Sequence, residues 1–312
     1  NTKRATTISG TLHLRKVRMT QLIDPTKKYP VLDIPEQRQS EPGLDDALQP
    51  KADHGEDSYR GNGRLEGRKA FITGGDSGIG RAVAIAYSRE GADVAFTYLP
   101  SEQIDADETV RLIEEAGRKA VAIEGDLTSE AFATDAVEQA AKQLDGLDIV
   151  VNNAGKQIHV DDILNITTEQ LTETFTVNIF AMFWIVKAAM KHLPAGASII
   201  NTTSIQAYSP SEGLLDYAAT KAAIANFTKG LSSQLIGKGI RVNAVAPGPI
   251  WTPLQPSYGQ PMEKLVRFGQ ESPIGRPGQP AELAGAYVFL ASEDASYVTG
   301  EIVAVTGGMP IS

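Results

Sequence analysis

The fold is decided by the stretch Ala70-Phe71-Ile72-Thr73-Gly74-Gly75-Asp76-Ser77-Gly78-Ile79-Gly80, where an apolar run ends in glycines and a helix-like segment begins. Downstream, short apolar runs alternate with segments of helical length. The predicted strands are 70–73, 93–98, 120–124, 149–152, 198–202, 240–245 and 302–305. The predicted helices are 80–90, 102–116, 129–144, 168–192, 214–236 and 281–292. This alternation predicts a single α/β domain, a doubly wound, Rossmann-like parallel sheet of seven strands covered by helices on both faces.

The glycine-rich turn also carries a functional prediction. Glycines between a first strand and its helix let backbone N–H groups approach a pyrophosphate, and the helix dipole favours that charge. The spacing is G-x-x-x-G-x-G over Gly74–Gly80, which differs from the general G-x-G-x-x-G fingerprint. Glycines serve any tight turn, but their place in the first strand–helix unit favours dinucleotide binding.

The end of the second strand bears on the choice of dinucleotide. An acid is expected there to bind the 2′-OH of NAD, but the chain has Tyr98 and Leu99. No Arg or Lys is present there to bind the 2′-phosphate of NADP. Asp76, in the glycine turn, would repel a phosphate, so the sequence favours NAD over NADP. Arg81 or the N-terminal segment could reverse this preference.

Composition excludes several other classes of function. The chain has 312 residues, 42% of them apolar, with a net charge of −9, which argues against a nucleic-acid partner. No apolar run approaches the roughly 20 residues needed to cross a membrane. The chain contains no cysteine, which fits a cytoplasmic protein, and its four histidines show no metal-binding spacing.

The first 65 residues differ from the rest of the chain. Residues 1–65 are rich in Pro, Gly and charged residues and show no sustained period, so we interpret them as an extended arm preceding a catalytic domain at 66–312. Residues 1–18 are interpreted as a leader or a misassigned start, because Met19 opens a plausible polar start. Residues 24–60 are expected to wrap a neighbouring subunit.

Tyr217 and Lys221 form a candidate acid–base pair. Residues four apart share one face of a helix, with Cβ atoms roughly 6 Å apart. An ammonium at that position is expected to lower the pKa of the phenol by about two units, towards neutral pH. Such a pair is more often a solvated helix face. Ser204, thirteen residues before the tyrosine at the end of a predicted strand, strengthens the catalytic reading.

Taken together, these motifs resemble the short-chain dehydrogenase/reductase family over about residues 65–309. The resemblance rests on Thr73-Gly74-x-x-x-Gly78-Ile79-Gly80, Asn152-Asn153-Ala154-Gly155, Asn178, Ser204, Tyr217-x-x-x-Lys221 and Pro247-Gly248. The arm and the stretch 246–254 are similar to a bacterial subgroup labelled glucose/ribitol dehydrogenase homologues or general stress oxidoreductases. The implied activity is NAD(P)-dependent interconversion of an alcohol and a carbonyl, and the implied assembly is a homotetramer.

The resemblance also implies residue roles. Tyr217 is the general acid or base, Lys221 lowers its pKa and binds the nicotinamide ribose, Ser204 binds the substrate oxygen and Asn178 holds a relay water. Asp126 is expected at the adenine, although it could equally serve the start of a helix. The implied cofactor contacts are Gly74, Asp76, Ser77, Gly78, Ile79, Tyr98, Leu99, Asp126, Leu127, Asn153, Ala154, Gly155, Tyr217, Lys221, Pro247, Gly248, Ile250 and Thr252.

Two other functions are compatible with the same fold. A sugar-nucleotide epimerase usually has a different glycine spacing and a longer substrate domain. A non-catalytic dinucleotide sensor or scaffold typically lacks the tyrosine or the lysine. The substrate stays open: an expected lid with Trp251, Leu254, Tyr258, Met262, Leu265 and Phe268 suggests a hydrophobic carbonyl, whereas Gln157, His159 and Gln206 could bind sugar hydroxyls.

Overall fold

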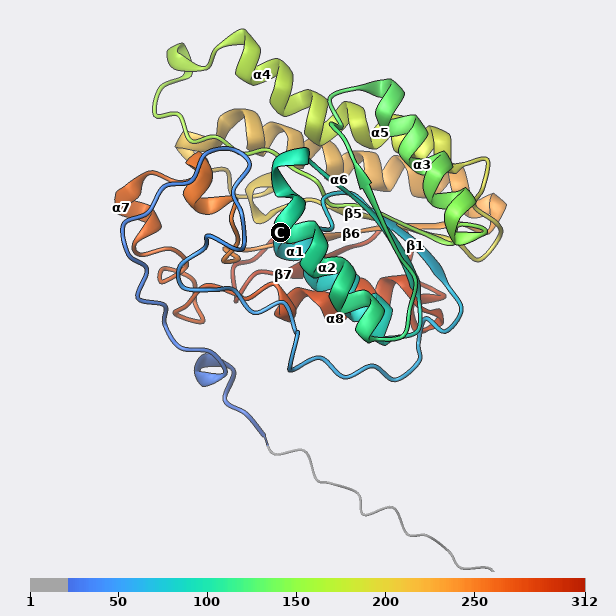
Figure 1. The fold of residues 1–312 in the computed structure, drawn as a ribbon. Helices are drawn as coiled ribbons and strands as arrows, with labels where there is room; N and C mark the ends of the chain where they lie inside the picture. Colours follow the sequence, from blue (N-terminus) through green and yellow to red (C-terminus); the bar gives the residue numbers. More distant parts are fainter. Residues whose placement is uncertain (1–21, 312) are drawn as a thin grey trace, which may run out of the picture.

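The computed structural model describes residues 22–311, and the expected leader at 1–18 lies outside them. A single parallel sheet with strand order β3-β2-β1-β4-β5-β6-β7 forms the centre of the molecule (Figure 1). The strands are β1 Lys69–Ile72, β2 Asp93–Tyr98, β3 Ala120–Glu124, β4 Ile149–Asn152, β5 Ser198–Thr202, β6 Arg241–Pro247 and β7 Ile302–Val305. The predicted parallel, Rossmann-like sheet is confirmed, and the strand order reverses between β1 and β4, next to the glycine turn.

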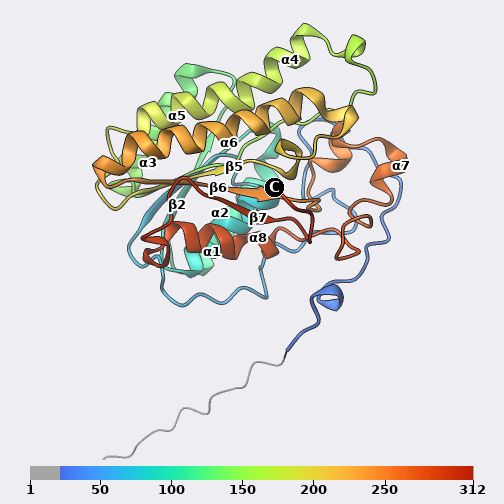
Figure 2. The same ribbon diagram turned by 180° about the vertical axis from the view of Figure 1, so that it is seen from behind.

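Helices cover both faces of the sheet. Figure 2 shows α3, α4, α5 and α6 on one face and α1, α2 and α8 on the other. The helices are α1 Gly78–Arg89, α2 Gln103–Glu115, α3 Glu130–Leu144, α4 Thr168–Phe175, α5 Ala181–Ala189, α6 Leu215–Leu235, α7 Met262–Leu265 and α8 Ala281–Ala291. Strands such as β4 and β5 are buried throughout, because a doubly covered sheet has no solvated face. The core therefore consists of two apolar layers, one on each side of the sheet.

One predicted helix is interrupted. The segment expected to be a continuous helix over 168–192 is α4, a π-helical turn at Thr176–Phe180 and then α5. A π turn has a wider pitch than an α-helix and is common at functional sites, and periodicity alone does not reveal it. The interruption is centred on Asn178.

Residues 22–65, the described part of the arm, have little regular structure and pack against their own domain. Ile34 and Leu48 are buried in a small apolar cluster with Trp251, Leu265 and Phe268. Figure 1 shows the arm (blue) beside α7 (orange), although the two are far apart in the chain. The described arm thus packs on its own domain, and its expected contact with a neighbouring subunit stays a prediction. Among the described residues, no helix is long and apolar enough to cross a membrane.

Candidate active site

The glycine turn joins β1 to α1 at the carboxyl edge of the sheet. Gly74 has φ +60°, a conformation that L side chains rarely adopt. A Cβ on Gly80 would lie 1.9 Å from the Gly74 carbonyl oxygen, so only glycine lets the helix start this close to the turn. Asn153, after β4, donates from Nδ2 to the Thr73 and Gly74 carbonyl oxygens at 3.2 and 3.1 Å. The turn is therefore held from both sides.

A cleft of about 1250 Å³ runs along this edge of the sheet. Every residue that the sequence assigned to cofactor contact lines it, from Gly74 to Thr252. Asp126 lines the cleft and accepts a hydrogen bond from the Thr128 N–H (2.8 Å) in the turn before α3, and its expected contact with the adenine stays a prediction. Parallel strands of a doubly wound sheet bring their carboxyl ends together at one edge, and for that reason these distant motifs meet.

The cleft is chemically suited to a dinucleotide. Asp76 is 1% exposed, and its Oδ2 has no hydrogen-bond partner among the described residues, although the residue lines the cleft. A buried carboxyl oxygen without a partner needs a ligand or a proton. Burial, and then the nearby Glu102 carboxylate, raise the pKa of Asp76 well above its usual range. The tight glycine turn and this unpaired acid together fit the phosphate and ribose parts of a dinucleotide.

Sequence reasoning missed Glu102 as part of this end of the cleft. Glu102 lies beyond the end of β2, but its carboxylate reaches back to accept the Leu99 N–H at 2.8 Å. Its burial raises its pKa to about 7. The signal was present in the sequence, because an acid three residues after Leu99 can fold back onto the amide at the start of a helical turn.

Arg81 faces away from this end of the cleft. Its guanidinium donates to the Asp76 carbonyl oxygen at 2.7 Å and forms an ion pair with Asp105 at 3.0 Å. The side chain is 6% exposed, so these internal partners satisfy it. The sequence left open a role for Arg81 in binding a 2′-phosphate. The guanidinium that would bind the phosphate is already engaged in these contacts.

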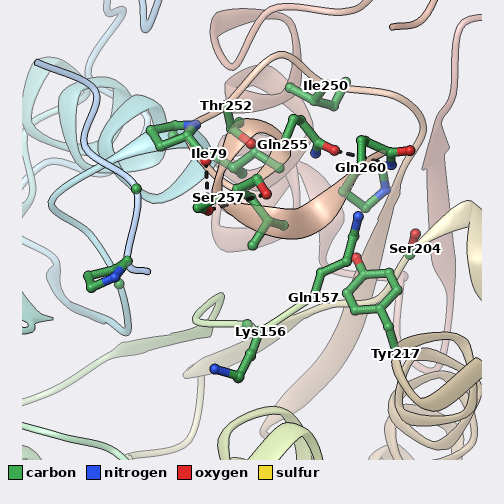
Figure 3. Close-up of a pocket in the computed structure, with 18 of the residues that line it drawn as sticks. Ile79, Lys156, Gln157, Ser204, Tyr217, Ile250, Thr252, Gln255, Ser257 and Gln260 are labelled. Carbon is green, nitrogen blue, oxygen red and sulfur yellow. Dashed lines mark hydrogen bonds between the residues drawn. The ribbon is translucent and has the colours of Figure 1, made fainter. Parts of the chain in front are cut away.

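At the opposite end of the cleft, Ser204, Tyr217 and Lys221 converge. Ser204 follows β5, and the other two residues occupy one face of α6. All three are nearly enclosed, with exposures of 5, 8 and 3%. The Ser204 and Tyr217 side chains both line the cleft and lie close to each other (Figure 3). The Lys221 ammonium lies 5.3 Å from the centre of the Tyr217 ring and donates to the Thr202 carbonyl oxygen at 2.9 Å.

The pKa of Tyr217 differs from the sequence expectation. Burial raises it to about 12, and the neighbouring Ser204 side chain acts in the other direction with a smaller effect. Burial lowers the pKa of Lys221 to about 8. The expected lowering of the tyrosine pKa was wrong for the protein alone, because desolvation disfavours the charged form of both groups and outweighs their attraction.

Asn178 lies behind this group and does not line the cleft. Its Oδ1 accepts the Lys156 N–H at 2.7 Å, and its Nδ2 donates to the Lys156 carbonyl oxygen and to Thr220 Oγ1, both at 3.0 Å. The side chain thus ties the loop after β4 to α6. The π turn in which Asn178 sits lets the side chain reach both elements. A relay water at this residue stays a prediction.

The substrate end of the cleft is more polar than the expected lid suggested. Trp251 is fully buried and donates from Nε1 to the Pro50 carbonyl oxygen at 2.8 Å, and Leu265 is fully buried in the same cluster with the arm. Leu254 and Phe268 line the cleft, whereas Tyr258 is 54% exposed. The lining also includes the polar residues Gln157, His159, Gln206, Ser211, Gln255, Ser257 and Gln260, alongside apolar ones such as Ile205 and Leu214. Figure 3 shows Gln157 beside Tyr217.

The lid was misread because its apolar residues have another partner. The sequence did not reveal that the arm packs there, so Trp251 and Leu265 were taken for pocket residues. In the part of the chain that the structure describes, no group of three or more acidic or histidine side chains is arranged to hold a metal ion.

Comparisons with known proteins agree with this architecture. The profile of a family described as enoyl-(acyl carrier protein) reductase matches residues 74–310. The uncharacterized oxidoreductase YhxD of Bacillus subtilis is 58% identical, over 93% of this chain and 98% of its own length. The glucose and ribitol dehydrogenase of Daucus carota is 45% identical, over 88% of this chain and 96% of its own.

A solved structure extends the likeness to three dimensions. The blue fluorescent protein from a metagenomic library, crystallised with NADPH, is 38% identical and has a TM-score of 0.73, covering 79% of this chain and 99% of its own. The shared fold, the glycine turn and the convergent motifs all lie within the matched region. This chain therefore belongs to the short-chain dehydrogenase/reductase family of oxidoreductases.

Proposed function

We propose that the protein is an NAD-dependent oxidoreductase that interconverts an alcohol and a carbonyl, with Tyr217 as the general acid or base. The observation that carries this proposal is the pair of hydroxyls on Ser204 and Tyr217, which open into the same cleft as the glycine turn. A bound nicotinamide would supply or accept the hydride. The residues of this chain then have only to position the substrate and move one proton.

Each side chain has a distinct role in that proton transfer. In reduction, the Tyr217 hydroxyl gives its proton to the substrate oxygen, and in oxidation it takes the proton back. The Ser204 hydroxyl donates to the same oxygen and stabilises the charge that develops there. Lys221, with its pKa lowered to about 8, is still mostly protonated at pH 7 and attracts the phenolate that Tyr217 becomes. Asn178 is a positioning residue that keeps α6 aligned with the loop after β4.

The preference for NAD over NADP rests on the two acids at the adenosine end of the cleft. Asp76 and Glu102 line the cleft where a ribose 2′ substituent would lie, and Arg81 is engaged elsewhere. The 2′-hydroxyl of NAD can hydrogen-bond to these carboxyls, whereas the 2′-phosphate of NADP would face two acidic side chains. We expect NADH to bind at least tenfold more tightly than NADPH in fluorescence titrations. Glu102→Gln should reduce the difference between the NADH and NADPH affinities. Tighter binding of NADPH than of NADH by the unmodified protein would contradict the preference.

We propose a polyhydroxylated substrate, such as a sugar or polyol. The lining near Tyr217 offers amide, imidazole and hydroxyl groups from Gln157, His159, Gln206 and Ser211. Amides and hydroxyls both donate and accept, which suits a chain of hydroxyl groups. The name of the carrot relative, a glucose and ribitol dehydrogenase, points the same way.

Absorbance at 340 nm provides the test of both activity and substrate. The protein is mixed with NAD and sugars or polyols, and with NADH and hydrophobic ketones. We expect turnover with the polyols and little with the ketones. The reverse pattern would overturn the substrate class. No turnover with any substrate, while the cofactor still binds, would favour a non-catalytic sensor.

We further propose that the protein assembles as a homotetramer. Leu171, Phe180 and Phe183 on α4, the following π turn and α5 are 43, 46 and 45% exposed, which leaves an apolar surface on these elements. Such surfaces are typical of contacts between subunits. Light scattering should give a mass near four times 33.3 kDa, and a monomeric mass would refute the proposal.

A further inference from the structure

The arm is anchored on both sides of the segment that reaches the cleft. On one side, the Pro25 carbonyl oxygen accepts from Arg276 at 2.8 Å. On the other, the Pro50 carbonyl oxygen accepts from Trp251 at 2.8 Å, and the Asp53 N–H donates to Gln279 at 2.9 Å. Ile34 and Leu48 are buried beside these anchors. The intervening chain is consequently fixed to the domain at both ends.

Between the anchors, Glu41, Pro42 and Gly43 form part of the cleft wall together with the glycine turn. A Cβ on Gly43 would lie 2.5 Å from the Pro253 carbonyl oxygen, so the backbone rests directly on the segment after β6. The Glu41 carboxylate forms an ion pair with Lys156, after β4, and Lys156 also contacts Glu173 at 3.1 Å. The arm therefore joins the two opposing walls of the cleft. In Figure 3 its faint blue ribbon runs along one edge of the pocket that Ile79, Thr252 and Lys156 also line.

Just beyond this crossing, Asp45 binds the glycine turn itself. Its Oδ2 accepts the Gly78 N–H at 2.7 Å, at the start of α1. A carboxylate this close to a phosphate-binding turn would normally repel the phosphate. Here His54 lies 2.9 Å and Arg81 3.7 Å from the same oxygen, and their positive charges offset those of Asp45 and Asp105. The contact fixes the turn, and the His54 and Arg81 side chains balance part of the carboxylate charge beside it.

We propose that residues 41–45, which we call the strap, close over the bound dinucleotide and retain it. The strap touches the phosphate turn and bridges both walls, so a cofactor lying in the cleft can enter or leave only when the strap lifts. The proposal rests on the cofactor site described above. It adds that this chain carries its own retaining segment, whose opening limits cofactor exchange.

Two substitutions should loosen the strap without touching the catalytic residues. Gly43→Ala adds a methyl group that collides with the Pro253 carbonyl. Asp45→Asn removes the charge that holds His54 and Arg81. Gly237→Ala is the matched control for the first, because a Cβ there meets no atom within 4 Å. Asp33→Asn is the control for the second, because Asp33 lies on the same arm and has no hydrogen bond or ion pair with the residues described.

The measurement is the rate of NADH binding and release by stopped-flow fluorescence, with release followed after a chase of excess NAD. We expect both rates to rise about tenfold in Gly43→Ala, through the clash, and in Asp45→Asn, through the lost ion pairs; a tenfold rise corresponds to a shift of about 1.4 kcal/mol in the opening equilibrium of the strap. The two controls should match the unmodified protein. If only the release rate rises, the strap merely contacts the bound NADH and does not block its passage. That result would overturn the proposal.

Hydrogen exchange on the unmodified protein gives an answer that does not depend on any variant folding. Saturating NADH should slow exchange of the amides at 40–48 at least tenfold, because the strap must lift for them to exchange. NADH that binds but leaves these amides unchanged would overturn the strap and spare the cofactor site. Failure of both NADH and NADPH to bind at all would overturn the cofactor site and the strap together.

Discussion

The two walls of the cleft are built in different ways. The wall with Ser204, Tyr217 and Lys221 comes from the end of β5 and the long helix α6, and each of these side chains is less than 10% exposed. The wall with the arm and the segment after β6 is mostly irregular and is held by ion pairs and single hydrogen bonds. Regular elements place reacting atoms precisely enough for proton transfer, whereas irregular segments open at a lower free-energy cost. The comparison suggests that chemistry belongs to one wall and cofactor exchange to the other.

The largest effect should follow from Tyr217→Phe, on the regular wall. Removing the hydroxyl removes the proton donor, and general acid–base catalysis contributes roughly 10²- to 10⁴-fold, so kcat should fall by about that factor. NADH affinity should stay within about twofold, because the ring remains in place. Steady-state kinetics and a fluorescence titration measure the two quantities.

Tyr208→Phe serves as the control, since Tyr208 is only partly buried and its hydroxyl has no hydrogen-bond partner among the described residues. Turnover by Tyr217→Phe equal to that of this control would remove Tyr217 from the mechanism.

The next effect tests whether the irregular wall is an integral part of the fold. Leu48 is fully buried against Trp251 and its neighbours, and truncating such a leucine costs about 2–5 kcal/mol. We therefore expect Leu48→Ala to lower the free energy of unfolding by that amount in urea melts. Val31→Ala, at a side chain on the same arm that is 56% exposed, should change it by less than about 0.5 kcal/mol. Equal stability of the two variants would mean that the arm contributes little.

The arm should also give stability a characteristic dependence on pH. The Asp45 and Glu56 carboxylates overcome burial and the repulsion from Arg81, and so raise the pKa of His54 from 6.5 to about 9. A raised pKa gives stability that is fully present below pH 6.5 and is lost as the pH rises through about 9. The free energy of unfolding should fall by at most about 1.4 kcal/mol per pH unit in this range. Subtracting the urea-melt profile of His54→Gln should isolate this slope, and identical profiles would contradict it.

The catalytic wall should show the opposite trend, which is cut short above pH 10. Burial lowers the pKa of Lys221 from 10.5 to about 8, so the folded state releases this proton before the unfolded state does. Stability should therefore rise between about pH 8 and 10.5. Part of this gain is cancelled above pH 10, because the raised pKa of Tyr217 acts in the other direction. Melts of Lys221→Met should lack the rise, and its persistence would show that another group causes it.

The regular wall was largely predictable from the sequence. Strand positions, the glycine turn and the convergence of Ser204, Tyr217 and Lys221 follow from periodicity and from the rule that parallel strands end at one edge. Boundaries agreed to within two residues for most elements, as with β2 at Asp93–Tyr98. Those signals are local or depend on a regular repeat, which is why they can be read from one sequence.

The irregular wall was not predictable in the same way. Asp45, Glu41 and Glu102 act through contacts that no period specifies, and two of them lie in a segment read as an extended arm. Trp251 and Leu265 looked like pocket residues because nothing in the sequence reveals that Leu48 covers them. The tyrosine pKa was misjudged because a pairwise attraction was considered without the burial of both partners.

The anchoring of the arm has a consequence for how the chain folds during synthesis. Pro25 and Pro50 are held by Arg276 and Trp251, which lie 251 and 201 residues further along the chain. The arm is made early on the ribosome, yet it has no docking surface until the last part of the domain has emerged. Closing loops of this length is slow, and domains generally need all their strands before such contacts form. The arm, although synthesised first, would thus be among the last segments to reach its native position, and its docking would complete folding.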